Sequence, residues 1–171
     1  MNWRELMEDA ALFAKNRGAE YVEVRLEPES IGQNITVEDE KPVQVATVSS
    51  PSMGILAYKN SGVGFWGISD ITKDAIHRMV ERAIDSAESN GSFGSVNPVL
   101  PERGFSGSHS YITPIKKDPF LVPVGEKINY LVKSQQAMKE AVGKRAFLRE
   151  GTMSFEKTRK LFLNSYGLFT D

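Results

Sequence analysis

The stretch Met53–Asp70, MGILAYKNSGVGFWGISD, decides the fold because it reads as two strands joined by a tight turn. The first strand, residues 53–59, carries apolar residues on both faces, which is typical of a central strand that is covered on both sides. Asn60-Ser61-Gly62 supplies the turn, since Asn and Gly adopt a positive φ at low cost. We expect this positive φ at Gly62.

The return strand, residues 63–69, combines two large aromatic side chains with glycines. Phe65 and Trp66 are predicted to lie in the core on one face of the sheet. Glycine weakens a strand interior, so Gly64 and Gly67 indicate a bulge or a close approach of another backbone. We therefore expect the hairpin at the centre of a sheet.

Apolar residues recur at intervals of three and four in three segments, which predicts helices over residues 2–17, 72–90 and 124–142. Asn2 and Thr72 are suited to cap the first two helices. The other expected strands cover residues 21–27 (ended by Pro28), 31–38, 43–49, and a final hairpin of 147–156 and 158–164. Consecutive strands on short turns predict an α+β fold, with a mainly antiparallel twisted sheet and about three helices packed on it.

The length of 171 residues fits one domain with a sizeable core, so we expect a single domain over residues 1–171. Residues 91–123 are rich in Gly, Ser and Pro. They are expected to wrap the domain or to be partly disordered, with at most one short strand near Tyr111. The chain ends at Asp171 directly after a strand, which predicts that a partner element is missing.

The composition limits the functions to consider. A formal net charge of -1, from 21 basic and 22 acidic side chains, disfavours nucleic acid and anionic membranes as main partners. The sequence has no Cys, which excludes disulfides, thiolate catalysis and Cys-based zinc sites. The polar start, MNWRELMEDA, does not resemble a signal peptide, and no run approaches the ~20 apolar residues of a membrane span. The expected compartment is the cytoplasm.

The two histidines, His77 and His109, are the first candidate site residues. Glu81 follows His77 at one helical turn, and two ligands at this spacing could share a zinc site. A third ligand is missing from the pattern and Lys73 would repel a cation, so a solvated polar face is the favoured interpretation. His109 lies in a Ser/Gly stretch and is expected on the surface.

Two further features have both a functional and a structural interpretation. Asp118, before Pro119, could face a substrate or could simply start a turn before the third helix. The basic residues Lys157, Arg159 and Lys160 could contact phosphate, but edge strands commonly carry such charges to block aggregation, and we favour that interpretation. We therefore predict no catalytic, cofactor-binding or metal-binding residue in this chain.

An ordered set of motifs spanning nearly the whole chain resembles the TldD/PmbA family, also called modulators of DNA gyrase. The motifs are Gly18-Ala19-Glu20-Tyr21-Val22-Glu23-Val24-Arg25, Asn60-Ser61-Gly62-Val63-Gly64-Phe65, Asp70-Ile71-Thr72, Asp118-Pro119 before Glu126-Lys127-Ile128, and Asn164-Ser165-Tyr166-Gly167. The chain departs from the pattern at Ala57, where many relatives have Arg. That departure leaves the catalytic and non-catalytic branches of the family both open.

The resemblance implies a zinc metallopeptidase system. In catalytic members the metal motif, H-E-x-x-x-H with a later Cys, lies in the C-terminal half, and members form homo- or heterodimers that cut unfolded peptides. This sequence lacks the motif and is expected to be the N-terminal domain alone, with zinc bound in a C-terminal domain that is absent from the chain. The leading hypothesis is a non-catalytic domain that helps to form the substrate cavity or the dimer. The alternative is a peptide- or protein-binding regulatory module, a modulator of DNA gyrase, from a non-catalytic relative.

Overall fold

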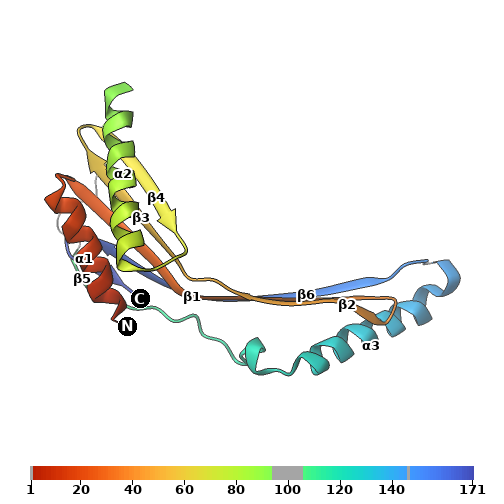
Figure 1. The fold of residues 1–171 in the computed structure, drawn as a ribbon. Helices are drawn as coiled ribbons and strands as arrows, with labels where there is room; N and C mark the ends of the chain where they lie inside the picture. Colours follow the sequence, from red (N-terminus) through yellow and green to blue (C-terminus); the bar gives the residue numbers. More distant parts are fainter. Residues whose placement is uncertain (1, 94–105, 146) are drawn as a thin grey trace. The chain divides into compact units, whose positions relative to one another are not determined.

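The computed structural model describes residues 2–93, 106–145 and 147–171. The chain divides into two compact units (Figure 1). The first unit is formed by residues 1–29, 50–112 and 158–171, and the second by residues 30–49 and 113–157. The single domain expected over residues 1–171 stays a prediction. Each unit has its own cluster of buried apolar side chains.

The described residues contain three α-helices, two short 3-10 helices and seven strands. In chain order they are α1 (Trp3–Asn16), β1 (Tyr21–Glu38), β2 (Lys41–Ser49), β3 (Ser52–Lys59), β4 (Gly62–Ile68), α2 (Lys73–Phe93), β5 (Gly107–His109), η1 (Pro119–Leu121), α3 (Val124–Val142), η2 (Gly143–Arg145), β6 (Glu150–Asn164) and β7 (Leu168–Thr170). The strand order is β4-β3-β1-β6-β7-β5, and β2 pairs with β1. β5 and β7 are parallel, whereas the pairs β1–β2, β1–β3, β3–β4 and β6–β7 are antiparallel, so the predicted α+β class is confirmed.

In the first unit, α1 and α2 pack on one face of the sheet (Figure 1). The buried face of β1 and β3 is formed by Val22, Val24, Leu26, Met53, Ile55 and Ala57. β3 lies between β4 and β1, but β4 ends the strand order of the described residues. The hairpin expected at the centre of the sheet therefore lies at its edge, and that prediction is wrong. Coverage of both faces of β3 was a wrong prediction, because Leu56 and Tyr58 on the opposite face are only half-buried. Antiparallel sheets commonly bury one face in this way.

The turn between β3 and β4 places its positive φ angles at Asn60 (51°) and Ser61 (63°). The positive φ expected at Gly62 is therefore wrong. A two-residue hairpin turn of type I′ has positive φ at both central residues, and here these are the two residues before the glycine. Gly62 already belongs to β4, where it pairs with Lys59.

Gly62 and Gly64 instead allow the backbone of α2 to approach β4. A Cβ atom at Gly64 would lie 1.9 Å from the Ala83 carbonyl oxygen, and one at Gly62 would lie 2.0 Å from the Ala87 carbonyl oxygen. The close approach predicted for Gly64 is confirmed. Gly67 has no such neighbour, since a Cβ atom there would lie 3.6 Å from the nearest atom, the Met53 carbonyl oxygen.

Both predicted helix caps are confirmed. The Asn2 Oδ1 atom accepts from the Glu5 N–H (3.4 Å), and the Thr72 Oγ1 atom accepts from the Ala75 N–H (3.4 Å). α2 continues beyond its predicted end at Asn90-Gly91, as far as Phe93. Gly91 serves packing here, because a Cβ atom at this position would lie 2.2 Å from the Asn60 carbonyl oxygen.

In the second unit, α3 packs against the later part of β1 and an adjoining part of β6. Its apolar cluster consists of Ile35, Val37, Leu131, Val124, Ile128, Val132 and Met153. Two buried polar side chains lie beside it. Gln135 is hydrogen-bonded to the β1–β2 turn, and Lys127 donates to the Gln33 amide oxygen and lies over the ring of Phe155.

Two predicted strand boundaries are wrong. β1 runs through Pro28 without a break, because pairing with β3 ends at Glu27 and pairing with β2 begins at Ile31. Pro28 thus lies between the region of β1 that pairs with β3 and the region that pairs with β2, so it interrupts neither register. The predicted final hairpin is one strand, β6, since its supposed turn around Lys157 contains no turn-forming residue.

The long segment expected over residues 91–123 is only partly described, because residues 94–105 lie outside the described residues. The one short strand expected in this segment is β5.

Candidate functional site

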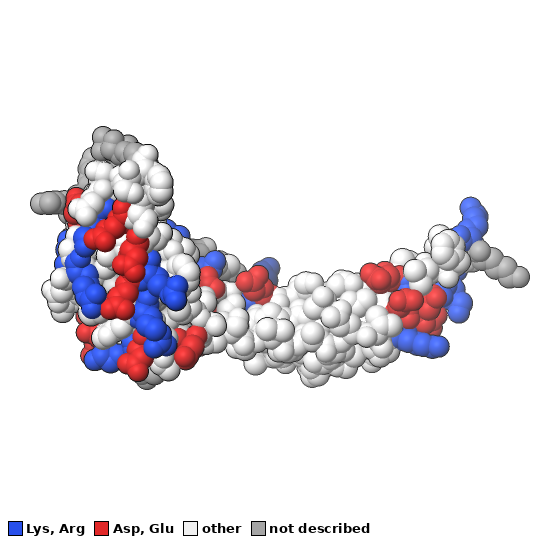
Figure 2. All heavy atoms as spheres, turned by 45° about the horizontal axis from the view of Figure 1, so that its top comes forward, with Lys and Arg blue, Asp and Glu red and all other residues white. Residues whose placement is uncertain are grey.

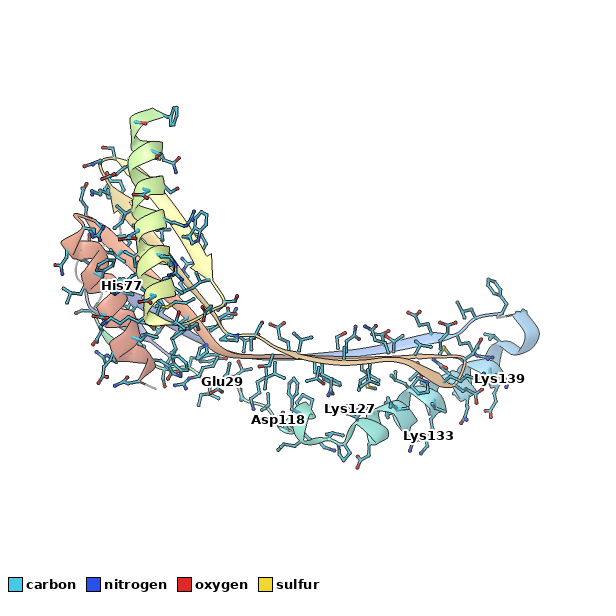
Figure 3. All side chains as sticks on the ribbon, viewed as in Figure 1. Glu29, His77, Asp118, Lys127, Lys133 and Lys139 are labelled. Carbon is cyan, nitrogen blue, oxygen red and sulfur yellow. The ribbon has the colours of Figure 1, made fainter. Side chains whose placement is uncertain are left out.

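His77 and Glu81 hold two helices together. The His77 ring stacks on Phe13 of α1, with centroids 4.2 Å apart and planes at 12°, and Glu81 is ion-paired with Arg17 at 2.8 Å (Figure 3 labels His77). Within the described ranges, no group of three His, Cys, Asp or Glu side chains is arranged to hold a metal ion. The solvated polar face expected here is a packing face between α1 and α2.

Asp118 begins η1, as its structural interpretation predicted. Its Oδ1 atom accepts from the Phe120 N–H (2.9 Å), and its Oδ2 atom lies 2.8 Å from the Lys157 Nζ atom. The hydrogen bond from Lys157, followed by that from Phe120, lowers the pKa of the Asp118 carboxyl. These contacts give the carboxylate a structural role in the second unit.

The other basic residues of β6 also have acidic partners. Arg159 Nε lies 2.8 Å from an Asp171 oxygen, and Lys160 Nζ lies 3.7 Å from a Glu27 oxygen. His109 is exposed on β5, as expected. Of the candidates from the sequence, the structure joins Asp118 to Lys157 in an ion pair, and the contacts of these candidates hold the fold together.

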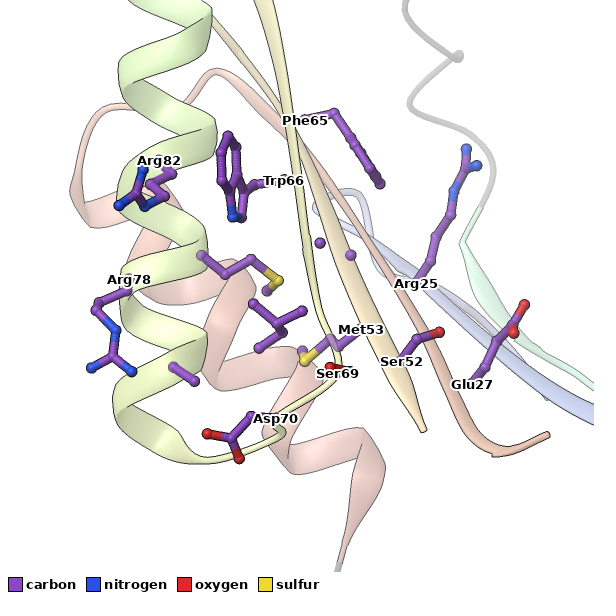
Figure 4. Close-up of a pocket in the computed structure, with 15 residues that line it drawn as sticks. Arg25, Glu27, Ser52, Met53, Phe65, Trp66, Ser69, Asp70, Arg78 and Arg82 are labelled. Atoms are coloured by element: carbon purple, nitrogen blue, oxygen red, sulfur yellow. The ribbon is translucent and has the colours of Figure 1, made fainter. Parts of the chain in front are cut away.

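An open pocket of about 770 Å³ in the first unit is lined by residues on both faces of the sheet beside β4 (Figure 4). Its main side chains come from three elements: Phe65 and Trp66 of β4, Arg78 and Arg82 of α2, and Arg25 of β1. Sequence reasoning missed both α2 arginines. Their spacing of four residues on the polar side of an amphipathic helix was the available signal.

The outer edge of β4, the side of residues 63–68 that faces away from β3, pairs with no other strand of the described residues. The turn pairs Lys59 with Gly62, so the hydrogen-bonded positions of β4 are the even-numbered ones, and odd-numbered residues point their N–H and C=O groups outward. The Val63 carbonyl is one of these, and it accepts from the Asn90 side chain at 2.8 Å. Phe65 and Gly67 follow, and β4 ends the strand order of the described residues.

Two exposed aromatic rings flank this edge. Phe65 is 57% exposed and lies against Gly54 of β3, and Trp66 is 41% exposed on the opposite side, toward α2 (Figure 4). Both were predicted to lie in the core, and that prediction is wrong. Alternation shows which side chains share a face, but a strand at the end of a sheet lacks a neighbour on one side to cover them.

This arrangement is suited to binding an extended peptide. An unpaired strand edge offers alternating donors and acceptors, and pockets on either side receive alternate side chains of the added strand. The exposed rings would contribute apolar contact area on both sides.

No helix among the described residues is long and apolar enough to cross a membrane.

Comparisons with known proteins agree with the fold. Residues 22–87 match the family model described as PmbA/TldA metallopeptidase domain 1. No curated protein matches the sequence.

Three solved structures share the fold. A candidate modulator of a DNA gyrase from Thermotoga maritima has 16% identity and a TM-score of 0.67 over 98% of this chain. TldE from Thermococcus kodakarensis has 21% identity and a TM-score of 0.69 over 96%. A candidate modulator of DNA gyrase from Bacteroides thetaiotaomicron has 14% identity and a TM-score of 0.68 over 97%.

The chain spans only 36%, 36% and 37% of the length of these three proteins, respectively. At these identities the three structures establish the fold alone, and the family model adds a sequence match over residues 22–87. The match over residues 22–87 confirms the resemblance to the N-terminal domain of the TldD/PmbA family that the sequence motifs indicate.

Proposed function

We propose that this chain is a non-catalytic first domain of a TldD/PmbA-type metallopeptidase and that it holds unfolded peptide along the outer edge of β4. The observation that carries the proposal is the pair of outward-pointing backbone groups at Phe65 and Gly67, in an open pocket between two exposed aromatic rings. Main-chain hydrogen bonds would bind many sequences, which suits a substrate defined by being unfolded.

The composition of the chain supports the non-catalytic role, because zinc chemistry requires a set of ligands that the sequence does not supply as a motif. A catalytic zinc needs three protein ligands, an activated water and a general base. This sequence has two histidines and no Cys, and one of the histidines, His77, is stacked on Phe13. We propose that zinc and the catalytic residues belong to a C-terminal domain, and that the protein works as a homo- or heterodimer in the cytoplasm.

A peptide-binding regulatory module is the second candidate, and the same edge favours it. A modulator of DNA gyrase would use the edge to bind a partner protein rather than a substrate. Direct binding to nucleic acid is disfavoured, because the net charge is -1 and acidic and basic side chains are interspersed on the face of the first unit in Figure 2. A peptidase activity of the complete protein would favour the first candidate.

Unfolded peptide should change the fluorescence of Trp66. The chain has two Trp residues, so Trp3→Phe leaves Trp66 as the single reporter beside the β4 edge. Titration with an unfolded peptide should then give a saturable shift in emission. In the matched variant Trp66→Phe, where Trp3 in α1 remains, emission should stay constant; a shift in Trp3 emission alone would contradict binding at this edge.

The chain alone should cleave no peptide, even when zinc is added. The sequence has two histidines and no Cys, and no three His, Cys, Asp or Glu side chains of the described residues are arranged to hold a metal ion. Dialysed protein should therefore also retain far less than one equivalent of zinc by elemental analysis. Turnover that a chelator blocks, or one equivalent of tightly held zinc, would show that the site lies within these residues.

A further inference from the structure

The two sides of the β4 edge differ in the charges that are free to bind a ligand. On the α2 side, the exposed residues Arg78 and Arg82 both line the pocket. The ion pairs found among the described residues include neither of them. Within the described part of the chain, two guanidinium groups without an ion-pair partner therefore lie beside the outer edge of β4.

Arg82 is also held in place. Its guanidinium carbon lies 5.1 Å from the centroid of the Trp66 ring, in the geometry of a cation–π contact. A guanidinium that stacks on a ring keeps the N–H groups at its rim free for a carboxylate. The side-chain entropy lost on binding an acid is smaller for an arginine that is already positioned.

On the opposite side of the edge, the cation that lines the pocket among the described residues already has a partner. Arg25 is ion-paired with Glu23 at 2.9 Å, and Glu27 adds a second carboxylate there. On the α2 side, Asp70 is the carboxylate of the pocket. It lies where the chain enters α2 and accepts from the Thr72 hydroxyl at 3.5 Å (Figure 4).

We propose that the α2 side of the β4 edge selects extended peptides that carry an acidic side chain. The proposal rests on peptide binding at this edge. A strand added beside β4 turns every second side chain toward α2, where a carboxylate would meet Arg78 and Arg82 and an apolar side chain would meet Trp66. The chemical class of the ligand is thus an unfolded peptide with Asp or Glu near apolar residues.

Three labelled peptides that differ only in one central residue, Glu, Gln or Lys, test the selection by fluorescence anisotropy. At low ionic strength, we expect the Glu peptide to bind about three- to tenfold more tightly than the Gln peptide, and the Lys peptide more weakly than both. The preference should shrink at 0.5 M salt, because exposed charges are screened. In the double variant Arg78→Gln/Arg82→Gln, the Glu and Gln peptides should bind equally.

Lys73→Gln provides the matched control, since Lys73 is an exposed cation on the same helix but does not line the pocket. This variant should keep the preference for Glu.

Equal binding of all three peptides to the natural sequence would overturn the selection while leaving peptide binding intact. Failure of every peptide to bind would overturn peptide binding itself. A single-stranded oligonucleotide that binds more tightly than any peptide would assign the two arginines to nucleic acid and overturn the proposal.

Discussion

Gly64→Ala should cost about 3 kcal/mol of stability, because an added side chain has no room between β4 and α2. The new Cβ atom would lie 1.9 Å from the Ala83 carbonyl oxygen and 2.5 Å from the Ala87 backbone nitrogen. Both neighbours are backbone atoms of a helix, so no side chain can rotate away to relieve the contact. Urea unfolding followed by circular dichroism at 222 nm would measure the loss.

Gly67→Ala is the matched control in the same strand. Its Cβ atom would meet the Met53 carbonyl oxygen at 3.6 Å, an ordinary van der Waals contact. We expect a change within about 0.5 kcal/mol, since substitutions without such clashes are usually near neutral. Equal losses for the two variants would mean that α2 does not rest on Gly64.

Gln135→Leu should destabilise the second unit by about 2–4 kcal/mol, because it removes a hydrogen-bond partner from the carbonyl of buried Val37 and from the N–H of half-buried Glu40. Gln135 is fully buried; its Nε2 atom donates to the Val37 carbonyl (2.5 Å), and its Oε1 atom accepts from the Glu40 N–H (2.6 Å). Leucine has a similar size, so packing is largely kept while both hydrogen bonds are lost. Urea unfolding gives the total loss, and hydrogen exchange at the Glu40 amide reports the affected turn directly.

Gln136→Leu is the matched control. It shows how much stability is lost when a Gln of α3 is replaced without loss of the hydrogen bonds that Gln135 makes. Gln136 is exposed and donates only to the Glu40 carboxylate at 3.2 Å. Its replacement should change stability by less than about 0.5 kcal/mol. An unchanged Glu40 exchange rate in Gln135→Leu would contradict the capping role of the buried amide.

The sequence alone predicted the elements whose signals are local. Periodicity placed α3 at residues 124–142, and the oxygen-bearing side chains Asn2 and Thr72 marked two helix starts. Such signals depend on residues within a turn or two of one another. The continuity of β1 through Pro28 was not predictable in this way, because it depends on where two other strands begin and end their pairing.

The candidate site was less predictable than the fold. Phe65 and Trp66 have the alternation expected of core residues, and only the strand order shows that β4 is the last strand on its side among the described residues. Arg78 and Arg82 belong to the site because Gly62 and Gly64 bring α2 against β4. This approach joins residues that are distant in sequence, so no motif within one segment reveals it.

Amide hydrogen exchange of the chain with and without a saturating unfolded peptide tests the central claim most directly. A peptide added to the outer edge of β4 would accept hydrogen bonds from the Phe65 and Gly67 amides, so their exchange should slow by at least about tenfold. The Gly64 and Trp66 amides, which already face β3, should change much less. A peptide that binds while the Phe65 and Gly67 amides exchange as before would contradict the account.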